Sequence, residues 1–292
     1  VDLDSDGDLD IVGANDTTPN AAWINDGSGR FEERGRRLGV AFDRSGAATG
    51  AMGVDVAARP GRNGNETLIA IGNFANEPSS LFIRRSGEAG FFDDAAAEGV
   101  SGATRRALTF GLLFTDLDLD GVEDLVQANG HLEAEITVIQ SSQSYRQSAQ
   151  VFRGLPGGGF REVPQDAIGD LGIPMIGRGL ASGDLDLDGD LDVAWADGGD
   201  FGNDQNRLWI NQGGLQAGTL GTFVDETALR FPALLDDSRD VDFIDFDLDG
   251  RHDLVFVSGV PFPVDEAAVS PSARCFRNLG GWRFDDVTER CG

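Results

Sequence analysis

One nine-residue pattern, repeated four times, constrains the fold of this chain more than any other feature. In the copy that begins at Asp184, aspartates stand at positions 1, 3, 5 and 9, and Gly189 stands at position 6. Aspartate oxygens at this spacing suit Ca²⁺, which takes about 6–8 oxygen ligands. The glycine permits the sharp turn that brings the carboxylates around one point.

The copies share these aspartates and differ at position 7. We predict the following Asp side chains as metal ligands: Asp2, Asp4, Asp6 and Asp10; Asp116, Asp118, Asp120 and Asp124; Asp184, Asp186, Asp188 and Asp192; Asp245, Asp247, Asp249 and Asp253. Position 7 is variable, which favours a backbone carbonyl as its ligand atom; its residues are Asp8, Val122, Asp190 and Arg251. The sequence thus predicts about four Ca²⁺ sites.

These loops differ from EF-hands, which need a bidentate Glu at position 12 and a helix on each side. Position 12 is Gly13, Gln127, Trp195 or Phe256, and apolar residues typical of strands follow each loop. The alternative is that Asp-Gly-rich segments are ordinary turns. Four copies with the same aspartates disfavour that alternative and predict calcium loops between strands.

The spacing of the loops indicates five repeat units. The first Asp of each loop falls at positions 2, 116, 184 and 245, so the first interval has room for a hidden unit. We expect that unit to have a strand ending at Asp55, a loop through Asn65 and a strand over 67–71. Ala57 and Arg59 replace its third and fifth ligands, so we expect it to bind no calcium. The predicted units of one domain over 1–292 are approximately 1–40, 41–100, 101–168, 169–230 and 231–292.

Each unit has the same internal order of short apolar segments separated by Gly, Asn and Asp. Strands are expected before the loops at 110–114, 179–183 and 241–244, after them at 9–12, 125–127, 191–195 and 254–257, and then at 22–24, 81–83, 150–152, 208–210 and 274–276. A fourth strand opens at Phe31, Phe160 or Phe284. Such hairpin repeats predict an all-β β-propeller with four-stranded antiparallel blades and inter-strand calcium loops. The first blade lacks its leading strand, and five units leave open a closed five-bladed ring or an arc of a larger propeller.

Composition restricts the partners. The net charge is −27, and all 23 basic residues are Arg, so we expect no binding to nucleic acid or to anionic membranes. The longest apolar runs are too short for membrane insertion. Cys275 and Cys291 are compatible with a disulfide formed in an oxidising compartment, and two unpaired thiols are the alternative. The chain opens inside a calcium loop, which leaves a lost signal peptide open.

The Asp-rich loops, preceded by Phe-Gly or Arg-Gly strands, resemble the FG-GAP (VCBS-type) repeats of integrin-alpha-like β-propellers. Residues 128–131, 145–147, 157–160 and 177–179 are further similar to the propeller of the cartilage-acidic-protein (ASPIC/UnbV) group. The resemblance implies Ca²⁺ held by the Asp side chains and the position-7 carbonyl, in agreement with the direct interpretation. The UnbV domain that usually follows this propeller is not recognisable.

Candidate catalytic residues are few, with two His, one Tyr and no Lys. His131, Tyr145 and Arg178 would favour an enzyme or a small-ligand site if they converged on one pocket, whereas a His that bonds within its own loop is the simpler interpretation. His252 has no predicted role. The insertion at 132–149 is the best candidate for a binding surface, and 261–271 is a second insertion.

We therefore expect a secreted or surface-exposed protein, extracellular or periplasmic, whose structural Ca²⁺ supports binding of a protein or glycan. Extracellular calcium modules bind at about 10⁻⁴–10⁻³ M, a range that suits this location. The alternatives are a carbohydrate-active or other enzyme domain, suggested by fold analogy alone, and a structural spacer. The sequence leaves the enzyme question undecided, although it favours a non-enzymatic module.

Overall fold

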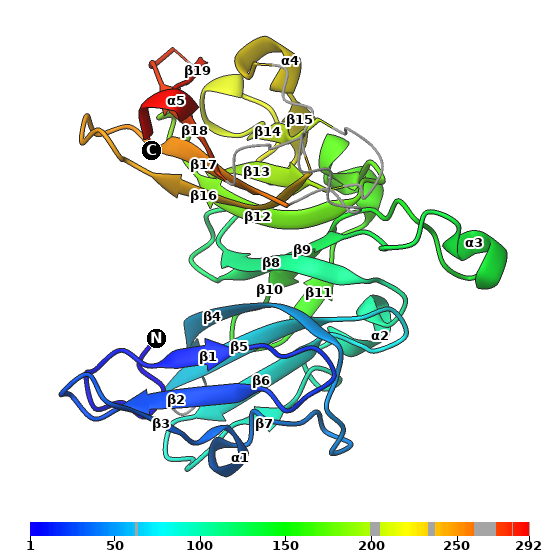
Figure 1. Ribbon diagram of the computed structural model, residues 1–292, viewed down its shortest axis with the longest axis vertical. Coiled ribbons are helices and arrows are strands. Elements are labelled where there is room, and N and C mark those ends of the chain that lie inside the picture. The colour runs from blue at the N-terminus through cyan, green and yellow to red at the C-terminus, as the bar shows by residue number, and fades with distance from the viewer. Residues whose placement is uncertain (62–63, 199–204, 233–236, 260–272, 282, 292) are drawn as a thin grey trace. The chain divides into compact units, whose positions relative to one another are not determined.

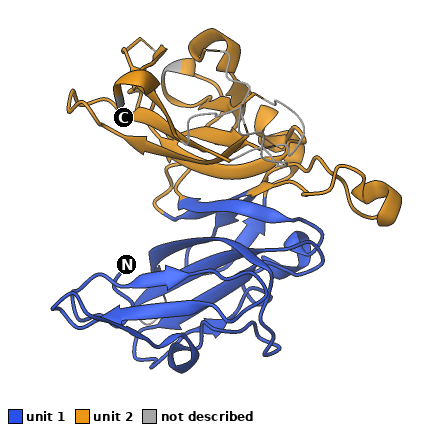
Figure 2. Ribbon diagram, in the orientation of Figure 1, with its two compact units in different colours: residues 1–114, 122–127, 151–162 blue, residues 115–121, 128–150, 163–292 orange. Residues whose placement is uncertain are grey.

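The computed structural model describes residues 1–292 except 62–63, 199–204, 233–236, 260–272, 282 and 292. The described strands form five antiparallel sheets built from consecutive hairpins (Figure 1). The chain divides into two compact units: residues 1–114, 122–127 and 151–162 form unit 1, and residues 115–121, 128–150 and 163–292 form unit 2 (Figure 2).

Unit 1 contains a three-stranded and a four-stranded sheet, together with most of a third sheet. The strands of these sheets are β1 (Ile11–Gly13), β2 (Ala21–Asn25) and β3 (Phe31–Glu33); β4 (Ala51–Gly61), β5 (Gly64–Asn73), β6 (Ser80–Arg85) and β7 (Phe92–Asp93); and β8 (Thr109–Thr115), β9 (Asp124–Asn129), β10 (Gln150–Gly154) and β11 (Phe160–Glu162). Strand β9 is buried along its whole length, as expected for a central strand covered on both faces. One core cluster of the unit joins residues of β5 and β6 to Leu112, Leu125 and Phe152.

Unit 2 contains two four-stranded sheets. Their strands are β12 (Gly177–Gly183), β13 (Asp192–Asp197), β14 (Arg207–Asn211) and β15 (Phe223–Asp225); and β16 (Ser238–Ile244), β17 (Asp253–Ser258), β18 (Ala273–Asn278) and β19 (Phe284–Asp286). Trp195 and Trp209 pack edge to face, with ring centroids 5.0 Å apart. Phe231 packs against Phe276 at 4.4 Å in the adjoining core. The large aromatic side chains named here therefore build the core.

Helices are short and lie in the connections between strands, except the last helix, which follows β19. They are α1 (Gly35–Leu38), α2 (Ser101–Thr104), α3 (Ile136–Ile139), α4 (Thr227–Arg230) and α5 (Thr288–Cys291), with 3₁₀ turns η1 (Gln165–Ala167), η2 (Asp170–Gly172) and η3 (Gly214–Gln216). None of the helices in the described part of the chain is long and apolar enough to span a membrane.

The predicted fold class, all-β with antiparallel propeller blades, is confirmed, and the first sheet has three strands as expected. Closure of the blades into a ring stays a prediction. The loop expected between Asp55 and Asn65 is wrong, because β4 continues to Gly61 and pairs with β5 residue by residue. Pro60 stands near the end of that hairpin, where a strand can accommodate proline.

Candidate metal centres

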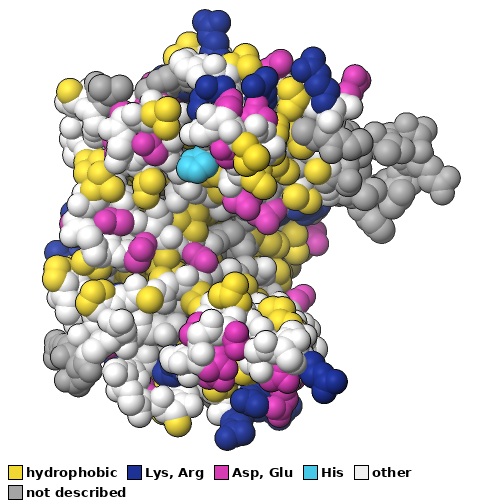
Figure 3. All heavy atoms as spheres, turned by 90° about the vertical axis from the view of Figure 1, so that its left-hand side faces the viewer, with side chains coloured by type: hydrophobic (Ala, Val, Ile, Leu, Met, Phe, Trp, Pro, Cys, Tyr) yellow, Lys and Arg dark blue, Asp and Glu magenta, His cyan; other side chains and the backbone are white. Residues whose placement is uncertain are grey.

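Each of the four Asp loops brings three carboxylates together. In each group, one oxygen from every member lies within 4.8 Å of the others. The groups are Asp2, Asp4 and Asp6; Asp116, Asp118 and Asp124; Asp184, Asp186 and Asp192; and Asp245, Asp247 and Asp253. Three loops thus use positions 1, 3 and 9, and the first loop uses positions 1, 3 and 5. Acidic side chains on the face in Figure 3 also lie in separate groups rather than in one continuous patch.

The loops fold by one local mechanism, seen well in the third. Its first carboxylate, Asp184, accepts hydrogen bonds from the backbone N–H groups of Asp188 at 3.0 Å and Gly189 at 3.1 Å. Two residues must take left-handed backbone angles, Leu187 with φ 61° and Gly189 with φ 95°. A left-handed Leu is strained and is held there by its surroundings. The same bonds and angles recur in the other loops.

The ninth Asp connects the loop to the third strand of its sheet. The buried carboxylate of Asp192 accepts from the N–H of Leu185 at 3.0 Å and from the N–H of Asn211 on β14 at 2.9 Å. Asp10 and Asp253 make the equivalent pairs of bonds, and Asp124 accepts from Gly154. Each ninth Asp therefore also has a structural role.

An asparagine at the end of the third strand completes this connection, and sequence reasoning missed it. Asn211 donates from Nδ2 to the carbonyls of Leu191 and Leu117, both at 3.1 Å, and accepts from the N–H of Gly221 at 2.8 Å. Asn25 and Asn278 occupy the equivalent positions. The identical Trp-Ile-Asn tripeptides that end at Asn25 and Asn211 are the signal that could have revealed it.

Positions 5 and 7 are also linked. The carboxylates of Asp6, Asp188 and Asp249 each accept the N–H of the residue two positions later, at 2.9–3.1 Å. Asp120, Asp188 and Asp249 are not members of the three-carboxylate groups. A role of the carbonyls of Asp8, Val122, Asp190 and Arg251 as ligands stays a prediction.

The crowding of carboxylates in the third loop has an electrostatic cost. Burial, with a smaller contribution from neighbouring Asp188, raises the pKa of Asp186 to about 6 and that of Asp190 to about 7. Burial, followed by the charges of Asp186 and Asp190, raises the pKa of Asp192 to about 8. An all-oxygen set of acidic groups that resist ionisation fits a hard divalent cation, which would stabilise their charged forms.

The fourth loop differs because two arginines already contact its carboxylates. Arg277 on β18 lies 2.5 Å from Asp247, measured from Nε to Oδ2, and its Nη2 lies 3.6 Å from Asp249. Arg251 at position 7 forms an ion pair with Asp249 and donates to the carbonyl of Asn278 at 2.9 Å. These residues fit a cation less well than those of the third loop.

The other candidates have structural surroundings. His131 is buried, its Nδ1 accepts from the N–H of Glu133 at 3.0 Å, and burial lowers its pKa. Its backbone N–H donates to the carbonyl of Tyr145, which supports the simpler interpretation of a His bonded within its own loop. Arg178 is buried and donates to the carbonyls of Gly130 and Gly177. His252 is exposed.

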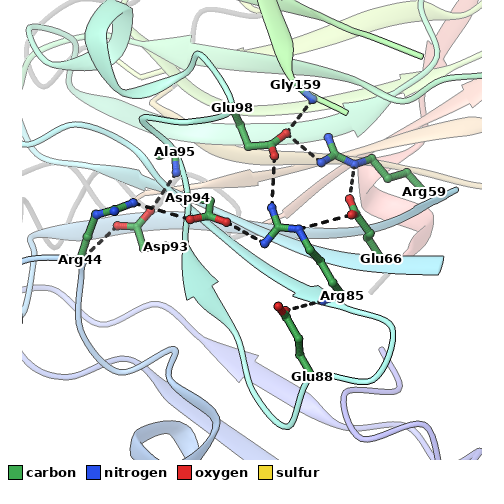
Figure 4. A network of polar contacts seen from close by, with 10 residues as sticks. All are labelled: Arg44, Arg59, Glu66, Arg85, Glu88, Asp93, Asp94, Ala95, Glu98 and Gly159. Carbon is green, nitrogen blue, oxygen red and sulfur yellow. Dashed lines mark hydrogen bonds and ion pairs between the residues drawn. The ribbon is translucent and has the colours of Figure 1, made fainter. Parts of the chain in front are cut away.

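The second repeat carries an ion-pair network in place of an Asp loop (Figure 4). Arg59, Glu66 and Arg85 are cross-strand neighbours on β4, β5 and β6. Arg59 contacts Glu66 at 2.9 Å and Glu98 at 2.8 Å, and Arg85 contacts Asp94 at 2.8 Å. The network borders a cavity of about 410 Å³ within unit 1. It ties three strands together in the blade whose Asp pattern is incomplete.

The insertion at 132–149 contains the short helix α3 and exposes two aliphatic side chains. Buried Ile136 anchors α3, and Thr137 donates to the carbonyl of Gln143 at 3.2 Å. Val138 and Ile139 are 86% and 71% exposed. The second insertion, 261–271, and the side chain of Cys291, on which the predicted disulfide depends, lie outside the described residues.

Comparison with known proteins supports the repeat assignment. Residues 2–57 and 184–256 match the model of the FG-GAP-like repeat. These segments contain three of the four Asp loops. No curated protein matches the chain.

Similar solved structures are glycoside hydrolases by title. A putative exo-β-1,3-galactanase from Bifidobacterium bifidum s17 has 11% sequence identity and a TM-score of 0.44, and the match covers 88% of this chain and 80% of that one. A β-fructofuranosidase from Bombyx mori has 13% identity and a TM-score of 0.45, with 82% of this chain and 50% of that one covered. An exo-β-1,3-galactanase from Clostridium thermocellum has 6% identity and a TM-score of 0.42, with 94% of this chain and 56% of that one covered. The chain therefore spans about half of the length of the last two proteins. Likeness at this level carries no argument about activity.

Proposed function

We propose that this chain is a calcium-stabilised module of β-propeller blades that binds a protein partner outside the cell. The observation that carries the calcium assignment is the convergence of three carboxylates in each of four loops. Like charges about 4 Å apart repel by roughly 4 kcal/mol at an effective dielectric of 20, so a divalent cation would stabilise each loop. The FG-GAP-like repeats support the same assignment.

Calcium would have a structural role in this proposal. Asp184, Asp186 and Asp192 would hold the ion in the third loop, and the equivalent groups would do so in the others. Since Asp192 also bonds to β14, the ion would help to fix three strands of one sheet. Isothermal calorimetry of Asp186→Ala should give one Ca²⁺ fewer than the wild type. An unchanged stoichiometry would contradict the assignment.

The insertion at 132–149 is the proposed partner surface. Figure 2 shows that it projects from the strands of its own unit, and it presents Val138 and Ile139 on an internally bonded loop. Exposed aliphatic side chains on a preorganised loop favour a protein with an apolar groove over a glycan. The resemblance of residues 128–195 to the cartilage-acidic-protein group, and a location outside the cell, belong to the same proposal.

A binding screen tests this surface directly. The wild type is screened against a panel of extracellular proteins and a glycan array, and hits are repeated with V138S/I139S. The matched control is Leu229→Ser on α4, because Leu229 is 77% exposed and lies elsewhere in the same unit. Protein binding lost only in V138S/I139S supports the proposal. Binding to glycans alone, unaffected by this double variant, would overturn it.

The alternative of an enzyme is less well supported. The cavity beside the ion-pair network contains Glu66 and Glu98, but both carboxylates are paired with Arg59. Arg59 thus contacts carboxylate oxygens that a general acid or base would need to exchange a proton with a substrate. The geometry therefore favours the binding module.

A further inference from the structure

The connection between β14 and β15 lies directly on the third Asp loop. A Cβ atom on Gly213 would come within 2.6 Å of Asp190 Oδ2, and one on Gly214 would come within 2.2 Å of Asp188 Oδ2. Only glycine allows this approach at both positions. From the same turn, Gln216 Nε2 donates to Asp186 Oδ2 at 2.8 Å. Two segments of unit 2 therefore surround one group of carboxylates.

Two side chains at this place have buried oxygens without donors. Asp190 is 1% exposed, and no donor among the described residues reaches either of its carboxylate oxygens. The amide oxygen of Gln216 is also buried and lacks a donor in the described part of the chain. Asp190 faces the charges of Asp188, Asp186 and Asp184, which repel it. Buried polar groups normally have partners, so these three oxygens point to a bound cation as their partner.

We propose that the Asp loops take up calcium in a fixed order. The third loop binds the ion most tightly, because the Asp190 carboxylate and the Gln216 amide oxygen complete its oxygen shell. The fourth binds it more weakly than the third, because Arg251 and Arg277 already neutralise Asp247 and Asp249. This order rests on the proposed calcium function; it adds the side chain of Asp190 from within the loop and that of Gln216 from outside the repeat pattern. Ca²⁺ accepts such mixed sets of about 6–8 carboxylate and amide oxygens.

Equivalent positions in the other repeats suggest the substitutions that test the fourth loop. The residue before Asn278 is Arg277, whereas Ile210 precedes Asn211, and the second loop has Val122 where the fourth has Arg251. The variant R251V/R277I therefore gives the fourth loop residues that other repeats already use. We expect it to raise the affinity of the fourth loop for calcium and so narrow the difference from the third. An unchanged difference between these sites would overturn the role of the arginines.

The third loop is tested by calcium titration of the whole chain against a competing chelator. Gln216→Leu should weaken the tightest class of sites by about tenfold, as loss of supporting groups does at metal sites. Gln216→Glu should keep or tighten it, since it still offers an oxygen. Gln212→Leu is the matched control, because Gln212 lies in the same connection and donates to the carbonyl of Ile210 instead.

The outcomes separate the two proposals. Equal affinity at all sites of the wild type, or identical isotherms for Gln216→Leu and Gln212→Leu, would overturn the order of binding and leave calcium binding intact. Absence of any calcium binding by the wild type would overturn the proposed function itself. If Gln216→Leu fails to fold, Gln216→Glu still decides, because a loss of tight binding in that variant contradicts a ligand role.

Discussion

The asparagine that ends the third strand gives a quantitative test of how the loops are joined to their sheets. Asn211 is fully buried and makes three hydrogen bonds, two as donor and one as acceptor. Asn25 makes the same number through its side chain, to Leu9, Gly27 and Gly29, but its bonds are exposed to water. The two positions therefore differ mainly in burial.

We predict that Asn211→Ala lowers the free energy of unfolding by about 3 kcal/mol, and Asn25→Ala by about 1 kcal/mol or less. Each lost buried bond contributes about 0.5–1.5 kcal/mol, whereas water replaces the exposed bonds. For a chain of this size, 3 kcal/mol corresponds to a melting temperature about 6–12 °C lower. Urea unfolding followed by tryptophan fluorescence measures both variants. Equal, small effects would refute the reasoning.

Two further predictions concern charge. When a chelator removes calcium, the pKa of Asp192 is about 8 in the folded state, against an ordinary value of 3.8. At pH values between these two, the folded state therefore binds a proton that the unfolded state has lost. The free energy of unfolding should therefore fall as pH rises from about 5 to 8, and bound Ca²⁺ should abolish this dependence. Urea denaturation across this pH range, with calcium and with EDTA, measures both. A free energy of unfolding that rises with pH in EDTA would contradict the prediction. Arg59→Ala removes the nearest cation from buried Glu66 and Glu98, which then have the longer 3.5 Å contacts to Arg85 as their ion pairs. It should cost about 3 kcal/mol in urea unfolding, against less than about 1 kcal/mol for the exposed Arg44→Ala. Equal costs would refute the structural role of the network.

Much of the fold could be predicted because its determinants are local. The spacing of Asp184, Asp186 and Asp192 and the glycine at 189 define a loop without reference to distant residues, and alternating apolar segments locate the strands on either side. The structure brings these three carboxylates together.

The remainder depends on pairing between segments. Arg59 meets Glu98 through strand register, and nothing in the sequence around either residue specifies the contact. Pro60 and Gly61 are typical of a turn, yet the ladder with β5 extends β4 through them. A single Asn at a hairpin end is equally typical of a turn, so only the repeated Trp-Ile-Asn tripeptide distinguishes Asn211 in the sequence, and its partners come from the structure.

Melting of the chain in calcium and in EDTA tests the central claim most directly. If free Ca²⁺ is about a hundred times Kd, each site adds roughly 2.7 kcal/mol of stability. At about 2–4 °C per kcal/mol, several sites should raise the melting temperature by more than about 10 °C. Differential scanning calorimetry should therefore show a large downward shift in EDTA that excess Ca²⁺ reverses. Identical melting curves in EDTA and in calcium would contradict the account.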